Sequence, residues 1–464
     1  MKQTTEAQSA VVRAPHDGSE VGGYRLARPD EVRAALDANV RATRACRDLP
    51  AYERAAALRR VADGLEAARE EFARTLALEA GKPITQARLE LDRAIFVFRD
   101  AAEEATRIEG AVLPADVLPT GKGRIALTRR FPLSPVVGIT PFNFPVLLAA
   151  HKIAPAMACG AAITLKPPPQ DPLTTLRLAD LVRDSGYPEG GVNVVPCHVE
   201  VAQILIEDPR VRVTSFTGSA KAGWAIRAKA GSKRVLLELG GNAGVIIEPD
   251  ADLEWAARRC ALGGFTYAGQ SCISTQRIFV HERVYQPFLD LFLPRVRDLR
   301  VGDVLDERTE VGPLISLEAA ERVERWIAEA VAGGARVAVG GGRRGQFVEP
   351  TVLLDTTPEM KVNCEEVFAP LVTVTPYRRL DDAVEQVNAS PYGLQAGVFT
   401  RDLATMFRLH AELDVGGVNG NDIPGFRVDR LPYGGAKASG LGREGVRYAI
   451  EEMTELRVLT LKLD

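Results

Sequence analysis

Cys272 has the surroundings of a cysteine that could carry out covalent chemistry. It lies in the segment Gly269-Gln270-Ser271-Cys272-Ile273-Ser274, whose small side chains would let a substrate approach the thiol. The thiolate of cysteine is a nucleophile that can form covalent intermediates. For a cysteine considered alone, the alternative is a buried small apolar side chain, which is the commoner role. The segment is a candidate nucleophile loop.

Glu238 is a carboxylate in a position that favours catalysis. It follows the apolar run Val235-Leu236-Leu237 and precedes Leu239 and the turn Gly240-Gly241. The carboxyl ends of strands are where active sites of α/β proteins form. The alternative is an ordinary solvated strand end.

The segment Phe216-Thr217-Gly218-Ser219 predicts the end of a strand, a turn and the start of a helix, with Gly223 five residues after Gly218. Backbone N–H groups at such a helix start point toward an anion. The spacing is not that of the GxGxxG dinucleotide fingerprint, so the pattern alone is weak evidence for a nucleotide site.

The elements that position these residues are predicted to be helices first and alternating strands and helices later. Apolar residues recur at three- and four-residue steps over 28–47 and 51–79, and a third helix is expected over 84–109, so the first hundred residues are interpreted as helical. Gly81 and Pro83 give a stop signal after the second helix. Short apolar strands then alternate with helices, which indicates parallel β-α-β units. The strands are expected at 135–140, 161–166, 192–195 and 211–216, and the helices at 145–159 and 172–185.

A second α/β region is predicted from about residue 241. Its candidate strands are 243–247, 277–280, 352–354, 372–376 and 396–399. Residues 110–135 indicate strands outside a core, and Leu456–Leu463 alternates apolar with polar or charged residues, which is typical of an edge strand that needs a partner. The fold class is therefore α/β, with two sheet regions and a small separate β element.

Composition excludes several classes of function. The 464 residues, 46% hydrophobic and 26% charged, are enough for two or three domains. A net charge of −3 and the absence of a long basic run argue against nucleic acid as a partner. No apolar stretch approaches the roughly 20 residues that span a bilayer, and the polar N-terminus lacks a signal sequence, so we expect no membrane association and a cytoplasmic location. The six cysteines contain no CxxC pair and the five histidines contain no i, i+4 pair. We therefore expect neither a disulfide framework nor a metal site, and at least five of the cysteines should be buried.

Taken together, these motifs resemble the aldehyde dehydrogenase superfamily. The matching segments follow the family's order and cover the chain from about Arg28 to the C-terminus: Pro141–Pro145 (PFNFP), Lys166-Pro167, Phe216–Ser219, Glu238–Gly241, Gly269–Cys272, Glu365–Pro370 (EEVFAP) and Pro432–Gly440. The resemblance implies a Rossmann-like cofactor domain (1–109 and 133–240), an α/β catalytic domain (241–449) and oligomerisation strands (110–132 and 450–464). It also implies oxidation of an aldehyde to the carboxylic acid with NAD or NADP, through a hemithioacetal and a thioester on Cys272.

The resemblance assigns roles to individual residues. Cys272 is the expected nucleophile, Asn143 the oxyanion-hole side chain and Glu238 the base that activates water. In the cofactor site, Lys166 would hold the adenosine ribose and Glu366 would hold the nicotinamide ribose. The pyrophosphate would lie at Gly218 and Ser219, with Gly223. Three apolar residues would also contact the cofactor: Phe368, Phe142 and Leu239. The alternative for Glu366 is a surface carboxylate of an acidic pair.

The chain departs from the family pattern at both ends of the expected site. Many NAD-preferring members carry a Glu three residues after the lysine, but here Pro169 stands there, which leaves NADP open. At the expected substrate opening stand His151 and Arg427, near Tyr433, which favour a small polar or anionic aldehyde. The alternative is that Arg427 pairs with Asp429 and faces solvent. Residues 421–429 resemble members that act on lactaldehyde, phosphonoacetaldehyde or glyceraldehyde 3-phosphate.

Two other functions remain alternatives at this point. A CoA-acylating relative would pass the acyl group to a thiol, but Glu238 as a water-activating base favours hydrolysis. A non-catalytic structural relative need not retain Cys272, Glu238 and Asn143 together, and this chain has all three. The resemblance also implies a homodimer or homotetramer, in which Leu456–Leu463 would extend a sheet of the neighbouring subunit beside the strands of 110–131.

Overall fold

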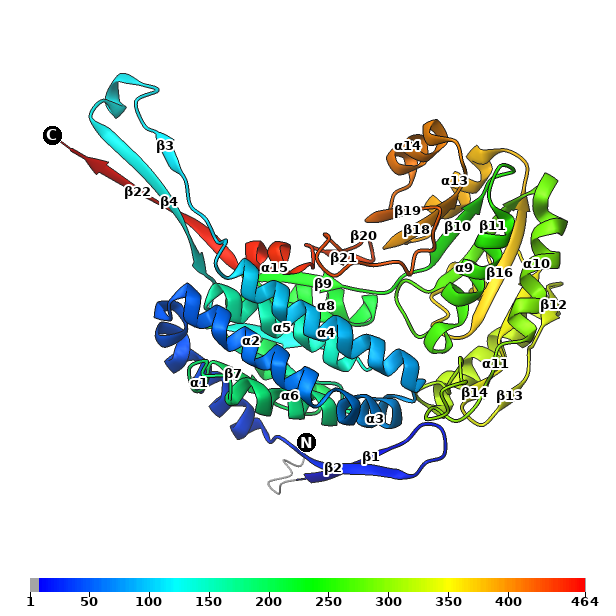
Figure 1. Ribbon diagram of the computed structural model, residues 1–464, viewed down its shortest axis with the longest axis horizontal. Helices are drawn as coiled ribbons and strands as arrows, with labels where there is room; N and C mark the ends of the chain where they lie inside the picture. Colours follow the sequence, from blue (N-terminus) through cyan, green and yellow to red (C-terminus); the bar gives the residue numbers. More distant parts are fainter. Residues whose placement is uncertain (1–7, 464) are drawn as a thin grey trace.

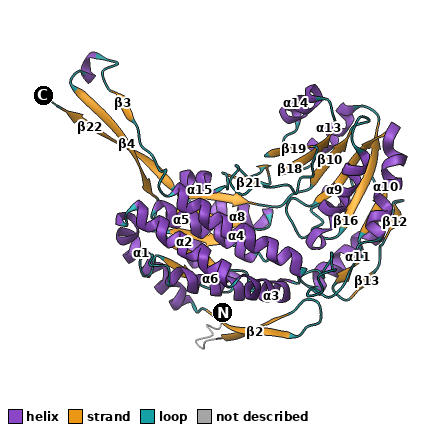
Figure 2. Ribbon diagram, viewed as in Figure 1, coloured by secondary structure: helices purple, strands orange, loops and turns teal. Residues whose placement is uncertain are grey.

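The computed structural model describes residues 8–463, which form two α/β bodies and a projecting arm of strands (Figure 1). Figure 2 shows helices packed around both sheets, whereas the arm carries almost none. None of the helices within residues 8–463 is long and apolar enough to cross a membrane.

The first body is built on a six-stranded sheet with the order β21-β9-β8-β5-β6-β7. Five strands are parallel, and the short β21 closes one edge antiparallel to β9, although its residues belong to the range predicted for the second domain. The bounds are β5 (Val136–Ile139), β6 (Ile163–Lys166), β7 (Val192–Val194), β8 (Val213–Thr217), β9 (Arg234–Glu238) and β21 (Gly440–Leu441). The strands are apolar on both faces because helices cover both. Val136 packs in the core that holds α2, α4 and α5, whereas its neighbour Val137 packs in the core that holds α1 and α7.

The helices of this body largely follow the predicted pattern. They are α1 (Pro29–Asp48), α2 (Ala51–Ala67), α3 (Arg69–Ala80), α4 (Ile84–Glu104), α5 (Pro145–Cys159), α6 (Leu173–Arg183), α7 (Val199–Glu207), α8 (Ala220–Lys229) and α15 (Val446–Glu452). The single helix predicted over 51–79 is wrong, because Ala68 leaves the helical conformation (φ −102°, ψ 15°) and divides it into α2 and α3. The stop at Gly81, which has φ 64°, is confirmed.

A β-hairpin precedes the first helix, so the interpretation of the first hundred residues as helical is wrong for this segment. Strands β1 (Gln8–Arg13) and β2 (Glu20–Leu26) pair antiparallel. The turn between them contains Asp17-Gly18, and Gly18 adopts φ 75°. An Asp-Gly pair between β-branched residues is a hairpin signal that helical periodicity further along the chain does not cancel.

The second body is built on a seven-stranded sheet with the order β12-β15-β16-β11-β10-β18-β19. Its five predicted strands are all present, and the bounds are β10 (Ala243–Ile247), β11 (Thr275–His281), β12 (Arg336–Val339), β15 (Thr351–Leu354), β16 (Leu371–Tyr377), β18 (Gln395–Phe399) and β19 (Gly417–Gly420). The helices around it are α9 (Leu253–Phe265), α10 (Tyr285–Arg297), α11 (Leu317–Ala332), α12 (Lys361–Cys364), α13 (Leu380–Asn388) and α14 (Leu403–Glu412). Short elements complete the chain: η1 (Pro119–Gly121), η2 (Thr266–Gly269), η3 (Glu282–Val284), β13 (Arg343–Arg344), β14 (Phe347–Val348), β17 (Tyr392–Gly393) and β20 (Ala436–Lys437).

The arm consists of β3 (Val112–Pro114), β4 (Arg124–Pro132) and β22 (Thr454–Lys462), in the order β22-β4-β3. The predicted terminal strand is present and pairs antiparallel with β4 of its own chain from Thr454 to Lys462. Its outer edge pairs with no strand of the described residues. Figure 1 shows the arm extending away from both bodies.

Candidate active site

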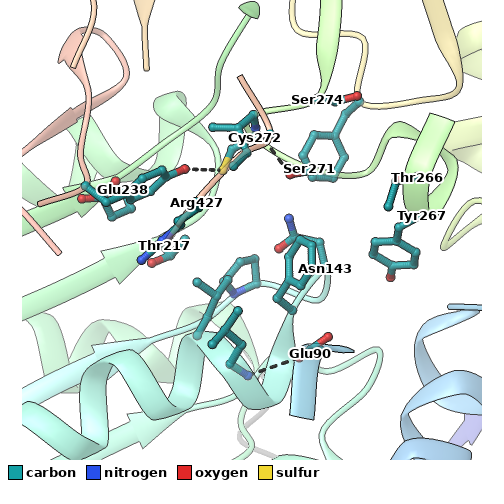
Figure 3. A pocket seen from close by; sticks show the side chains of 18 of the residues that line it. Glu90, Asn143, Thr217, Glu238, Thr266, Tyr267, Ser271, Cys272, Ser274 and Arg427 are labelled. Atoms are coloured by element: carbon teal, nitrogen blue, oxygen red, sulfur yellow. Dashed lines mark hydrogen bonds between the residues drawn. The ribbon is translucent and has the colours of Figure 1, made fainter. Parts of the chain in front are cut away.

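A cavity of about 660 Å³ lies where the two α/β bodies meet, and it gathers side chains from both (Figure 3). From the first body come Asn143, which follows β5, and Glu238, the last residue of β9. From the second come Cys272, which precedes β11, and the segment with Arg427 and Tyr433. The three residues predicted to react therefore line one cavity, although they are far apart in the sequence.

Asn143 is held between the two bodies. Its Nδ2 donates a hydrogen bond to the backbone oxygen of Gln270 at 3.1 Å, while its Oδ1 is buried and has no partner among the described residues. Phe144 and Pro145 follow it as the N-cap and first residue of α5, so the start of that helix fixes the backbone next to Asn143. The bond to Gln270 uses one amide hydrogen of Asn143 and leaves the second for another acceptor.

The Cys272 loop approaches other backbone very closely. Tyr267 and Ala268 adopt φ 50° and 52°, and Gly269 adopts φ 68°. A Cβ on Gly269 would lie 2.1 Å from the Ala369 oxygen, and a Cβ on Gly241 would lie 2.1 Å from the Cys272 oxygen. These two glycines are required because any side chain would push the nucleophile loop out of place.

Cys272 is partly exposed and its Sγ lies 3.0 Å from the hydroxyl oxygen of Tyr433. Burial raises the pKa of the Cys272 thiol to about 12, and the hydrogen bond with Tyr433 opposes that rise. Among the other cysteines, Cys364 is also partly exposed, so four rather than five of the six are buried.

Glu238 is only 5% exposed, and its Oε2 has no hydrogen-bond partner among the described residues. Burial raises its pKa well above that of an ordinary glutamate, and the carboxylate of Glu444 raises it further. Arg427 and Lys152 act in the opposite direction. A carboxyl group in this environment takes up a proton more readily than a solvated one.

A group of buried charges lies behind Glu238. The Arg427 guanidinium is 3.2 Å from the Asp429 carboxylate and 3.3 Å from the Glu444 carboxylate, and it lies 3.7 Å over the Tyr433 ring. Lys152 lies 3.5 Å from Glu444. Burial disfavours the ionised form of Glu444, but the nearby cations, Lys152 first, lower its pKa to about 2.

Two of the three substrate residues predicted from the sequence, Arg427 and His151, occupy different places. Arg427 lines the cavity and does pair with Asp429, but it does not face solvent, because its side chain is 7% exposed. The prediction that His151 stands at the opening is wrong. Its ring is buried behind Arg427, with Nε2 3.1 Å from Asp429 and 3.2 Å from Arg427, since α5 is buried along its whole length.

A second cavity, of about 610 Å³, shares Pro141, Phe142 and Thr217 with the lining of the first. Both cavities are lined by Gly218 and Ser219, and Ser219 caps the N-terminus of α8. A Cβ on Gly223 would lie 2.3 Å from Leu239, so this glycine lets α8 pack against the end of β9. The lining includes Lys166, at the end of β6, and two further lysines that the sequence reasoning did not single out.

Glu366 and Phe368 line the first cavity. Glu366 accepts a hydrogen bond from the Gly241 N–H at 2.9 Å and lines the reactive cavity, so the alternative of a surface carboxylate is wrong. Burial raises its pKa to about 7, against the effect of that hydrogen bond. The Phe368 ring packs edge-on against Phe142, with centroids 5.9 Å apart.

A model of the aldehyde dehydrogenase family matches residues 2–459. The chain belongs to the aldehyde dehydrogenase family. It is therefore an oxidoreductase that acts on the aldehyde group with NAD or NADP, and the resemblance seen in the sequence motifs is confirmed.

Relatives of this aldehyde dehydrogenase cover nearly its whole length. It is 45% identical to 3-sulfolactaldehyde dehydrogenase of Priestia megaterium, over 89% of this chain and 87% of the relative. It is 38% identical to sulfoacetaldehyde dehydrogenase of Neptuniibacter caesariensis, over 96% of this chain and 98% of the relative. Among solved structures, aldehyde dehydrogenase 21 from Physcomitrella patens, in complex with the reaction product succinate, is 40% identical with a TM-score of 0.97, covering 99% of this chain and 96% of that one. Glyceraldehyde-3-phosphate dehydrogenase GapN of Methanocaldococcus jannaschii, complexed with NADP, is 36% identical with a TM-score of 0.94. The match covers 99% of this chain and 100% of that one. These similarities confirm the predicted fold class.

Two charged residues of this dehydrogenase's site were missed in the sequence. Lys152 stands in α5, all of whose residues are buried, and donates to the hydroxyls of Ser215 and Thr217 at 3.1 and 2.8 Å. A lysine inside an otherwise apolar helix is a signal for a buried partner. Glu444 had no such signal, since it follows a Gly-rich loop in the sequence.

Replacing Tyr433 with Phe should slow alkylation of Cys272. The phenol hydroxyl favours the thiolate, so its loss raises the thiol pKa and lowers the thiolate fraction at any pH below that pKa. We expect iodoacetamide at pH 8 to react about fivefold more slowly, the equivalent of a hydrogen bond of about 1 kcal/mol. Mass spectrometry of the Cys272 peptide over time measures the rate. Tyr52→Phe, at an exposed tyrosine, is the control, and an unchanged rate in Tyr433→Phe would contradict the assignment.

Proposed function

We propose that this dehydrogenase converts a small anionic aldehyde to the corresponding carboxylic acid by covalent catalysis on Cys272, with NADP preferred over NAD. The observation that carries the proposal is the convergence in one cavity of a thiol, an amide donor, a buried carboxyl and an arginine. These are Cys272, Asn143, Glu238 and Arg427. The body with the six-stranded sheet would bind the cofactor, and the body with the seven-stranded sheet would present the nucleophile.

Each residue has a chemical task in this reaction. The Cys272 thiolate adds to the aldehyde carbon, and the carbonyl oxygen takes the negative charge. The free amide hydrogen of Asn143 and the backbone N–H of Cys272 donate to that oxygen; such donors contribute roughly 3–4 kcal/mol to lowering the barrier. NAD(P), held by the residues that line the second cavity, would supply the hydride acceptor, and loss of hydride from the carbon would leave a thioester on Cys272.

Glu238 would complete the cycle by accepting a proton from the water that attacks the thioester. The C–S bond then breaks, the thiolate is restored and the acid leaves. In sum, an aldehyde, an oxidised cofactor and water give a carboxylate, a reduced cofactor and two protons. Because the raised pKa of Glu238 must be exceeded before it can act as a base, deacylation should speed up as the pH rises through that pKa.

Glu238→Gln should retain the first turnover and lose most of the later ones. Hydride transfer precedes the base-assisted step, so rapid mixing should still give a burst of reduced cofactor absorbing at 340 nm. The steady-state rate should fall roughly 100-fold or more, and its ascending pH limb should disappear. Cys272→Ala, which should show neither phase, gives the blank. Equal loss of burst and steady state would assign Glu238 to an earlier step, and rescue of Glu238→Gln by added CoA would favour acyl transfer to a thiol.

Arg427 provides the charge that would select an anionic substrate. Its Nη2 contacts His151 and Glu444 at 3.2 and 3.3 Å, whereas its buried Nε, 3.2 Å from Asp429, has no hydrogen-bond partner among the described residues. A carboxylate, sulfonate or phosphate held there would be oriented by a charge remote from the reacting carbon. The names of the relatives support this substrate class, since sulfolactaldehyde and sulfoacetaldehyde carry sulfonates and succinate is a dicarboxylate.

Arg427→Leu should discriminate between charged and neutral aldehydes. We expect KM for succinate semialdehyde and sulfoacetaldehyde to rise roughly 10- to 100-fold, about 1.4–2.8 kcal/mol, with little change for propanal. Arg259→Leu is a matched control, because Arg259 also lines the cavity but bonds to Asp422 at 2.6 Å. An equal response to both kinds of aldehyde, or a wild type that prefers long aliphatic aldehydes, would contradict the proposal.

The second cavity supports a preference for NADP. Three lysines and no Asp or Glu line it: Lys166, Lys221 and Lys229. Lys229 donates to Gln203 and Glu207 at 2.9 and 3.3 Å, whereas Lys166 and Lys221 have no ion pair with any described residue. Pro169, in the lining, occupies the place where a carboxylate would repel an additional phosphate.

Lys221→Met should weaken the binding of NADP and leave the binding of NAD almost unchanged. Losing one cation near a phosphate should raise the KM for NADP roughly 10-fold, with less than about twofold change for NAD. Arg227→Met is the control, since Arg227 is an exposed cation of the same helix that does not line the cavity. A similar change for both cofactors would remove Lys221 from phosphate recognition.

The arm would mediate assembly into a dimer or a dimer of dimers. Its β22 has one unpaired edge and exposed apolar side chains, with Val458 65% and Leu456 58% exposed. Such an edge pairs readily with another strand, which in a symmetric assembly would come from the neighbouring subunit. A cytoplasmic location stays a prediction from the sequence.

A further inference from the structure

Lys82, in the connection between α3 and α4, places a cation in the interior beside the Asn143 loop. Its side chain has no solvent exposure, it forms an ion pair with Glu90, and its Nζ donates to the backbone oxygen of Asn143 at 2.7 Å. The ammonium therefore binds the peptide group of the residue proposed to stabilise the oxyanion.

Glu90 holds the next residues of the same loop. Its Oε1 accepts hydrogen bonds from the Val146 and Leu147 N–H groups at 3.0 and 3.2 Å. These N–H groups belong to the first turn of α5, where backbone donors have no partner within the helix. The N-cap residue Phe144 supplies no side-chain acceptor, so Glu90, from α4, caps α5 in its place.

The same cation also contacts the loop that leads to Cys272. The Lys82 Nζ lies 3.9 Å from the Phe144 ring centroid and 4.3 Å from that of Tyr267. The Tyr267 hydroxyl donates to the Ala80 oxygen at 2.9 Å, and the Tyr267 oxygen accepts from the Gln270 N–H at 3.1 Å. In Figure 3, Asn143 lies between Glu90 on one side and the Cys272 loop on the other.

A buried ion pair contributes little net stability, since desolvation offsets the attraction between the charges. Burial lowers the pKa of Lys82; Glu90 and Asp171 oppose that effect, and Arg93 adds to it. An apolar side chain could fill this space at less cost, but it could not bind the Asn143 oxygen or cap α5. The pair is thus suited to fixing a position more than to stabilising the fold.

We infer that Lys82 and Glu90 are positioning residues that hold Asn143 in the orientation needed to donate to the oxyanion on the substrate. The inference rests on the proposed role of Asn143. With its peptide oxygen bound to Lys82, the first turn of α5 bound to Glu90 and its side chain bound to Gln270, Asn143 is fixed at three points. Neither member of the pair contacts the reacting atoms.

The test is a double-mutant cycle with Lys82→Met and Asn143→Ala. Lys82→Met alone should lower kcat/KM roughly 10- to 100-fold, as expected for a small displacement of a catalytic group. On the Asn143→Ala background, Lys82→Met should lower kcat/KM by less than about twofold, because the side chain that Lys82 positions is gone. The alkylation rate of Cys272 by iodoacetamide, which creates no oxyanion, should change less than about twofold in either background. An equal loss in both backgrounds would overturn the inference.

Glu79→Gln is the matched control. Glu79 is buried and caps α6 through the Leu173 and Thr174 N–H groups at 2.8 and 3.0 Å, but no hydrogen bond of the described residues joins it to the Asn143 loop. It should leave kcat/KM within about twofold, and a loss as large as that of Lys82→Met would assign both to general stability and overturn the inference.

If Lys82→Met does not fold, Glu90→Gln replaces it in the cycle. The amide oxygen can still accept from Val146 and Leu147 while the charge that holds Lys82 is lost, so the same non-additivity with Asn143→Ala is expected. Failure of the proposed function is distinguishable. If Asn143→Ala itself leaves kcat/KM unchanged, the role of Asn143 fails and the inference with it; if only the cycle is additive, the inference fails alone.

Discussion

The hydrogen bond from Asn143 to the Gln270 oxygen joins two loops that belong to different sheets. One loop leaves β5 of the first body and the other enters β11 of the second, and the cavity exists because they lie against each other. The contact between the two loops tolerates little change, because a Cβ on residue 241 would lie only 2.1 Å from the Cys272 oxygen. A reactive geometry made by two separate bodies needs such fixed contacts, since a shift of one ångström between reacting groups costs about 100-fold in rate.

Charge around the contact between the two loops is arranged so that the reacting centre itself is close to neutral. Burial raises the pKa of both the Cys272 thiol and Glu238, which favours their protonated forms. The neighbouring cations Arg427 and Lys152 are offset by Glu444 and Asp429. Arg427 and Lys152 therefore both have carboxylate partners in a low-dielectric interior, where an uncompensated charge would be costly.

Local signals were enough to predict most of the helices and strands, whereas the contacts of the site residues depended on packing. The helix Pro145–Cys159 was predicted with its observed bounds, because a proline starts it and Gly160 ends it with φ 81°. The strand Ala243–Ile247 was likewise predicted as observed, since an isolated apolar run has few other uses. The hairpin over Gln8–Leu26 was missed because its strands carry few buried side chains, so that the alternation is weak.

What the sequence could not give is the depth at which a side chain lies. His151 and Arg427 are 276 residues apart, and only the fold places the imidazole behind the guanidinium rather than beside it at an opening. Lys82 and Glu90 belong to a helical region with no motif of its own, yet they contact the loop of Asn143. Such residues position another residue and do not contact the substrate themselves. Their residue types and spacing therefore form no motif that could be found in the sequence.

Each cavity presents a cationic side chain that an anion could contact, although carboxylates balance the charge around the reacting centre. Lysines line the second cavity, and Arg427 lines the first with a buried Nε that has no hydrogen-bond partner among the described residues. The whole chain is slightly acidic, with a net charge of −3, so this positive character is local to the site. A fixed local charge in a cavity of low dielectric attracts an anion more strongly than the same charge on the surface. Substrate and cofactor would thus each be held by an anionic group, one in each cavity. The aldehyde carbon would then lie at the neutral centre, where the only charge to be stabilised is the one that the reaction creates.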